Sequence, residues 1–130
     1  MFKKILLAND GSQASLHAAR LALNLARVHG ASLTVVNVVD PYPFIGIGEV
    51  NPMGFEAYME AARALAQQSQ HQVLSLAQSL HFAQDIHTLT VEDVSVAEGI
   101  VKTAQDTGAD LIVIGSHGRN AVSRLVMGSV

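Results

Sequence analysis

The sequence predicts an α/β fold, an open parallel β-sheet with helices on both faces. Three observations predict it. Four short apolar runs recur along the 130 residues, segments with helical periodicity separate them, and turn-forming residues close them. Strands that alternate with helices pair in parallel through right-handed crossovers. Because 49% of the residues are hydrophobic and 15% are charged, the chain can bury a core as one domain, 1–130.

The first part of the chain predicts two strands around one helix. Residues 3–9 form a short apolar run, and the β-branched run at 31–39 is typical of a strand covered on both faces. Between them, Ser12 can cap a helix by accepting a hydrogen bond from a free backbone N–H. Gly30 can end that helix in a left-handed conformation.

Residues 40–54 hold all three prolines of the chain and predict an irregular loop. The loop carries Tyr42, Phe44 and Ile45, and three roles for them stay open. They could form a lid over a ligand, cover a dimer interface, or pack on their own helix.

The second half of the chain predicts helices at 54–80 and 95–107 and strands at 85–91 and 109–115, with Gly108 ending the shorter helix. Because apolar and polar side chains alternate at 85–91, we expect this strand at an edge of the sheet. One face of the long helix carries residues at helical spacing that are predicted as core: Phe55, Met59, Ala62, Leu65, Ser69, Val73, Leu76 and Leu80.

Composition and charge exclude several classes of function. The net charge of −3 and the scattered basic residues give no electrostatic reason to expect nucleic acid as the partner. No cysteine is present, and the six histidines show neither H-x3-H nor H-E-x-x-H, so no structural metal site is expected. No apolar stretch approaches the roughly 20 residues of a membrane span, and the run after Lys3 and Lys4 is too short for a signal peptide. A cytoplasmic protein is therefore the expectation.

A glycine-rich loop follows the last predicted strand. In open α/β sheets, ligands bind beyond the carboxyl ends of the strands, where both "AND" and "GSHG" lie. Glycines let backbone N–H groups converge on phosphate oxygens, and a helix starting near Gly128 would add its free N–H groups and positive dipole end. The lysine-containing G-x-x-x-x-G-K-[ST] loop is absent. The pattern present is G-x2-G-x9-G-S, formed by Gly115, Gly118, Gly128 and Ser129.

With these residues, the sequence resembles the universal stress protein family. The resemblance covers essentially the whole chain, from "KKILLANDGS" and "ASLTVVNVV" to "ADLIVIGSHGRNAVSRLVMGSV". The glycine pattern is similar to the signature of the branch that binds ATP. The resemblance therefore implies a Rossmann-like fold that holds ATP, with AMP or ADP as alternatives, together with Mg²⁺. Relatives continue through a further helix and a fifth strand, so the resemblance also implies that the chain is C-terminally incomplete.

The resemblance implies nucleotide contacts for twelve residues. Adenine would lie between the ends of the first two strands, and Asp10 would meet the nucleoside or a metal ion. His117 could be a general base or a solvated side chain, and Arg119 could pair with phosphate or point to water. The implied residues are Ala8, Asn9, Asp10, Val38 and Ile114 for the base, Gly115, His117, Gly118 and Arg119 for the ribose and phosphates, and Gly128, Ser129 and Val130 for the phosphates.

The predicted function is that of an ATP-binding sensor or regulator in a stress response. The alternative is an enzyme, a slow ATPase or an autophosphorylating phosphotransferase that uses the same pocket, although no Walker lysine supports it. An interaction module without a ligand is disfavoured by the complete glycine pattern. The resemblance also implies a homodimer that pairs through the sheet edge beyond the fourth strand. A chain that ends at Val130 would leave this edge, "LIVIG", bare.

Overall fold

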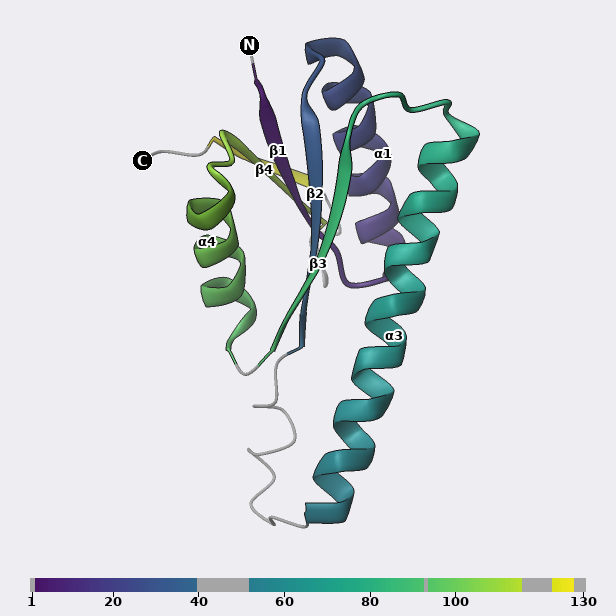
Figure 1. Ribbon diagram of the computed structural model, residues 1–130, viewed down its shortest axis with the longest axis vertical. Coiled ribbons are helices and arrows are strands. Elements are labelled where there is room, and N and C mark those ends of the chain that lie inside the picture. Colours follow the sequence, from purple (N-terminus) through teal and green to yellow (C-terminus); the bar gives the residue numbers. More distant parts are fainter. Residues whose placement is uncertain (1, 40–51, 93, 116–122, 128–130) are drawn as a thin grey trace.

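The computed structural model describes residues 2–39, 52–92, 94–115 and 123–127, with the backbone alone at 52–53 and 123–127. The elements follow the predicted order of strands and helices (Figure 1). They are β1 (Lys4–Ala8), α1 (Gln13–His29), β2 (Ser32–Val39), α3 (Pro52–Ser79), β3 (Ile86–Glu92), α4 (Val96–Thr107), β4 (Leu111–Gly115) and β5 (Ser123–Met127).

The sheet has the strand order β3-β2-β1-β4-β5, and β1 to β4 run parallel as predicted. Ile5 of β1 lies opposite Leu33 of β2 on one side and Leu111 of β4 on the other. Helices α1 and α3 cover one face and α4 covers the other (Figure 1). The predicted edge position of β3 is confirmed, because β3 pairs with β2 alone among the described strands.

Strand β5 corrects the sequence prediction for residues 123–127. They were expected inside a glycine loop, but they pair antiparallel with β4, with Leu111 opposite Met127. An uncovered β4 would present a row of unpaired N–H and C=O groups, and an apolar segment that turns back can satisfy them. The "LIVIG" edge is therefore covered by β5, and the homodimer expected through that edge stays a prediction.

The helix ends confirm the predicted capping residues. Ser12 accepts a hydrogen bond from Ser15 N at 3.0 Å, and Gly30 ends α1 at a φ of 65°. Gly108 ends α4 in the same way. Helix α3 begins at Pro52, inside the predicted loop, because proline is well tolerated in the first turn of a helix. Tyr42, Phe44 and Ile45 lie outside the described residues.

The core lies on both faces of the sheet, because successive strand residues point to opposite sides. Leu7 and Val35 pack with Leu23 of α1, and Leu6 packs with Ile100 of α4. Within the described parts of the chain, no helix is long and apolar enough to span a membrane.

The predicted core face of α3 is confirmed at Met59, Ser69 and Val73, which are buried. It is wrong at Leu65, which is 65% exposed. Leu65 lines a pocket at the carboxyl end of the sheet, where the first turns of α3 extend beyond the strands (Figure 1). The buried face of the helix passes through Met59, Ala66, Ser69 and Val73, and Leu65 lies one position to the side of it.

Candidate functional site

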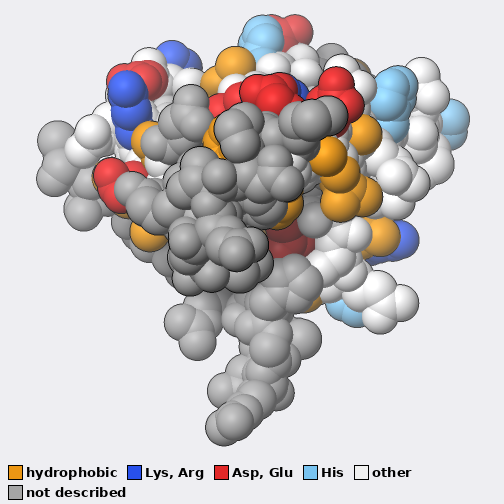
Figure 2. All heavy atoms as spheres, turned by 90° about the horizontal axis from the view of Figure 1, so that it is seen from below, with side chains coloured by type: hydrophobic (Ala, Val, Ile, Leu, Met, Phe, Trp, Pro, Cys, Tyr) orange, Lys and Arg blue, Asp and Glu red, His pale blue; other side chains and the backbone are white. Residues whose placement is uncertain are grey.

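A pocket of about 250 Å³ lies at the carboxyl ends of β1 and β2, under the first half of α3. Figure 2 looks at this end of the molecule and shows both hydrophobic and acidic side chains on it. This is the end at which open α/β sheets bind ligands. The lining residues come from three segments: Asn9 and Asp10 after β1, Asn37, Val38 and Val39 of β2, and Tyr58, Ala62, Leu65, Ala66 and Ser69 of α3.

The pocket exists because the chain leaves the sheet after β1. Asn9 N donates to Val36 O at 2.9 Å, which continues the β1–β2 ladder by one step. The next amide, Asp10 N, instead donates to Ser15 Oγ at 3.1 Å, and Gly11 turns at a φ of 83°. Peptide groups alternate in direction along a strand, so the N–H and C=O of Val38 point the same way as those of Val36. They therefore face the space that β1 has left.

Asp10 lies at the rim of this pocket and is exposed. Its Oδ1 accepts a hydrogen bond from Ser12 N at 2.9 Å, so the side chain caps its own turn. This contact fixes the direction of the carboxylate relative to the first turn of α1.

Asn9 lies one residue earlier, but its amide points inward and is buried. Its Oδ1 accepts from Ser15 Oγ and, at 3.5 Å, from Gly11 N. Its Nδ2 donates to Asn37 Oδ1 at 3.5 Å. The structure therefore gives Asn9 a role in holding the turn, in addition to its place in the pocket lining.

Asn37 and Ser69 are site residues for which the sequence predicted no ligand contact. Asn37 Nδ2 donates to Ser69 Oγ at 2.7 Å, and both side chains are buried. A signal was present, because Asn37 is a lone polar residue in the apolar run "TVVNVV", and a buried polar group needs a partner. The partner lies 32 residues away, on another element, and no local pattern identifies it.

Gly115 has a packing role that is independent of any ligand. A Cβ at this position would lie 2.5 Å from Ala14 O and 2.7 Å from Ser15 Cα. The first turn of α1 therefore lies directly against the end of β4, and a larger residue would separate them.

The structure brings together some of the predicted site residues. Asn9, Asp10 and Val38 line the pocket. Ala8 and Ile114 instead belong to the cluster between the sheet and α4, which the Val38 side chain also joins. The other six lie outside the described residues: His117, Gly118, Arg119, Gly128, Ser129 and Val130.

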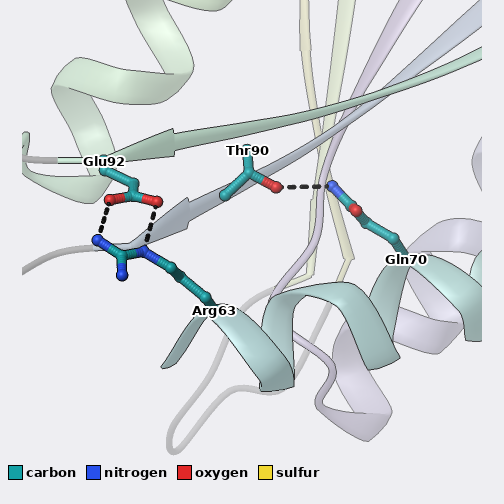
Figure 3. Close-up of polar contacts among 4 residues, drawn as sticks. All are labelled: Arg63, Gln70, Thr90 and Glu92. Atoms are coloured by element: carbon teal, nitrogen blue, oxygen red, sulfur yellow. Dashed lines mark hydrogen bonds and ion pairs between the residues drawn. The ribbon is translucent and has the colours of Figure 1, made fainter. Parts of the chain in front are cut away.

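Polar contacts hold α3 over the outer strand next to the pocket (Figure 3). Arg63 donates to both carboxylate oxygens of Glu92, each at 2.9 Å. Gln70 Nε2 donates to Leu89 O at 2.9 Å and to Thr90 Oγ1 at 3.2 Å. The hydrogen bond from Arg63 lowers the pKa of Glu92 below its ordinary value; partial burial opposes this, and the positive charge of Arg63 adds to it. Among the described residues, no group of three or more His, Cys, Asp or Glu side chains could hold a metal ion.

The fold and the site define a class: a Rossmann-like α/β protein whose pocket lies at the carboxyl ends of the first two strands. The model of the universal stress protein family matches residues 1–130. The chain is 35% identical, over 130 residues, to a universal stress protein of Methanocaldococcus jannaschii, covering all of this chain and 74% of that one. The chain belongs to the universal stress protein family.

Solved structures confirm the fold. Universal stress protein UspA of Lactobacillus plantarum is 27% identical, with a TM-score of 0.72 over 98% of this chain and 86% of that one. A universal stress family protein of Arabidopsis thaliana, solved with AMP bound, has a TM-score of 0.63 over 92% of this chain and 80% of its own. It is 12% identical, so this likeness concerns the fold alone.

Proposed function

We propose that the protein binds an adenine nucleotide, ATP with Mg²⁺, in this pocket and acts as a nucleotide-dependent sensor or regulator. The observation that carries the proposal is the pocket at the strand ends, which Val38 lines. The alternation of peptide groups along β2 directs the N–H and C=O of Val38 toward it. Adenine presents an amino donor beside a ring-nitrogen acceptor, which matches a strand N–H and C=O. The Arabidopsis relative with bound AMP supports an adenine nucleotide as the ligand class.

The size of the pocket suits part of the nucleotide. Pockets that bury a drug-sized ligand have volumes of about 300–1,000 Å³. The volume here, about 250 Å³, suits the base and sugar better than a complete triphosphate. The phosphates would lie toward the start of the glycine pattern, with Gly115 and Gly118 as the proposed contacts. Gly128 and Ser129 follow Met127, which pairs with Leu111 at the amino end of β4, so they are not among the donors proposed for this pocket.

The residues present fit a magnesium ion that is held mainly by phosphates. Mg²⁺ keeps several water ligands and takes one or two carboxylates together with phosphate oxygens. Asp10 is the acidic residue among those that line the pocket. We assign to it the orientation of the hydrated ion or of the nucleoside hydroxyls.

Filling the pocket tests the proposal. Leu65→Trp places an indole at the pocket wall, and Val28→Trp, at a position 76% exposed on α1, is the matched control. Calorimetric titration with ATP and Mg²⁺ should show at least about tenfold weaker binding to Leu65→Trp, about 1.4 kcal/mol. Val28→Trp should bind like the parent chain. Equal ATP affinity in the two variants would show that the nucleotide does not use this pocket.

The same samples test the enzymatic alternative. The rate of phosphate release from ATP should stay far below the turnover rates of kinases, which are about 1–100 per second. A rate in that range, lost in Asp10→Ala, would replace the sensor proposal with that of an enzyme.

A further inference from the structure

Four buried polar side chains form a hydrogen-bonded chain, and three of them line the pocket. They are Ser15 of α1, Asn9 after β1, Asn37 of β2 and Ser69 of α3, each 6% exposed or less. Each link joins a side chain to the next, so the chain of contacts runs from α1 to α3 through the ends of both strands. Buried polar groups cost free energy unless they are paired, and these four are paired with one another.

The links of this polar chain differ in length. Asn37 Nδ2 to Ser69 Oγ spans 2.7 Å, whereas Asn9 Nδ2 to Asn37 Oδ1 spans 3.5 Å. N–H···O hydrogen bonds are most often about 2.9–3.0 Å long, so the first link is tight and the second is at the limit. Ser69 Oγ also donates to Ala66 O at 3.0 Å, within its own helix. The firm connection of this chain is therefore the one between β2 and α3.

Ser69 also contacts the turn that carries Asp10. A Cβ at Gly11 would lie 3.0 Å from Ser69 Cβ, so the turn and the helix pack directly on each other at this point. Ser69 is thus the one described residue of α3 that hydrogen-bonds to β2 and packs against the Asp10 turn.

We propose that Asn37 and Ser69 are positioning residues of the pocket, through which β2 holds the α3 wall at a fixed distance from the Asp10 turn. The effect on the ligand rests on the proposed function, because Asp10 and the α3 residues from Tyr58 to Ser69 both line the pocket. Loss of the link moves the wall, and the ligand loses contacts on both sides.

The link is not needed to keep α3 on the protein. Val73 and Ala77, one and two turns further along, are buried in the main core cluster and hold the second half of the helix. Breaking the bond from Asn37 to Ser69 therefore acts on the half of α3 that walls the pocket.

The test removes the Ser69 hydroxyl in one variant and, as a control, a similarly buried hydroxyl of α4 in another. Ser69→Ala deletes the partner of Asn37, whereas Thr103→Val deletes a buried hydroxyl of α4 that donates to Gly99 O at 2.7 Å. In Ser69→Ala, hydrogen exchange at residues 58–68 should become about tenfold faster, with residues 73–79 unchanged. The ATP dissociation constant should rise about tenfold. In Thr103→Val, neither quantity should change.

The outcomes separate this inference from the proposed function. Faster exchange spread equally over both halves of α3, or no faster exchange at 58–68, would overturn the positioning role. A different result is also informative: Ser69→Ala shows the faster exchange at 58–68, but the parent chain itself binds no ATP. That result would overturn the proposed function and leave the positioning role standing.

A second variant guards against loss of folding in the first. Asn37→Ser shortens the other side of the link, so the hydroxyl no longer reaches Ser69, and it leaves α3 unaltered. The same local exchange pattern in Asn37→Ser supports the link as the cause. If Asn37→Ser had the hydrogen-exchange pattern and the ATP affinity of the parent chain, the positioning role would be overturned.

Discussion

The two halves of α3 differ in what holds them to the sheet. In the second half, Val73 and Ala77 are buried in the main core cluster, with Leu33 and Val35 of β2. The longer part before it, from Pro52 to Gln70, has a small separate cluster, with Met59 against Val39, and it carries the polar ties of Arg63, Ser69 and Gln70. One half builds the core of the domain and the other forms the wall of a pocket.

This difference separates stability from the geometry of the site. Burial of apolar surface is strong and non-directional, whereas a hydrogen bond fixes direction but contributes only about 0.5–1.5 kcal/mol net. Segments with few buried apolar contacts open locally at lower free energy. We therefore expect the second half of α3 to set the stability of the protein, and the first half to set the shape of the pocket.

A charged side chain introduced into the second half of α3 should give the largest change in unfolding free energy. Val73 is completely buried, so Val73→Asp places an unpaired carboxylate in the core and should cost about 3–5 kcal/mol of unfolding free energy. Leu74→Asp, at the next position, alters an exposed side chain and should cost less than about 1 kcal/mol. Urea unfolding followed by circular dichroism measures both. Equal losses would show that the core does not depend on this half of the helix.

A second tight contact sharpens the comparison, because α1 packs closely on the end of β4. Gly115→Ala brings a Cβ to 2.5 Å from Ala14 O, a backbone atom that cannot rotate away. We expect a loss of about 1–3 kcal/mol in unfolding free energy, as for other overpacked sites. Unchanged stability in thermal unfolding would mean that the first turn of α1 can shift away from β4 at little cost.

The parts of the fold that depend on local patterns could be predicted from the sequence. Ser12 and Gly30 act within one turn of the helix that they cap, so neighbouring residues suffice to identify them. The four parallel strands follow from apolar runs of strand length, and the edge position of β3 follows from its alternation.

The parts that depend on distant partners could not be predicted. Strand β5 forms because β4 offers an edge, and the segment at 123–127 alone carries no sign of that pairing. Leu65 has the spacing of a core residue, but the helix turns the neighbouring Ala66 toward Val39 of β2 instead. For the site, the position of Asp10 beyond β1 followed from the strand pattern, whereas the link between Asn37 and Ser69 required the fold itself.

The smallest expected effect belongs to the ion pair between Arg63 and Glu92. Both side chains are well exposed, at 46% and 31%, so solvent and salt screen the pair and its contribution should stay below about 1 kcal/mol. Arg63→Gln should therefore barely change stability, and Lys102→Gln, which removes an exposed charge from α4, is the control.

The pH dependence of the unfolding free energy shows whether the contribution of Arg63 comes from its ion pair with Glu92. Because Arg63 lowers the pKa of Glu92 in the folded state, the contribution is complete above the ordinary value of 4.5. It disappears as the pH falls through the lowered value, where the carboxylate of the folded protein takes up its proton. The difference in unfolding free energy between the parent chain and Arg63→Gln should thus be present at neutral pH, shrink in acid, and shrink also in high salt. A difference that persists after Glu92 is protonated would show that Arg63 holds α3 through contacts other than this ion pair, such as packing of its aliphatic stem.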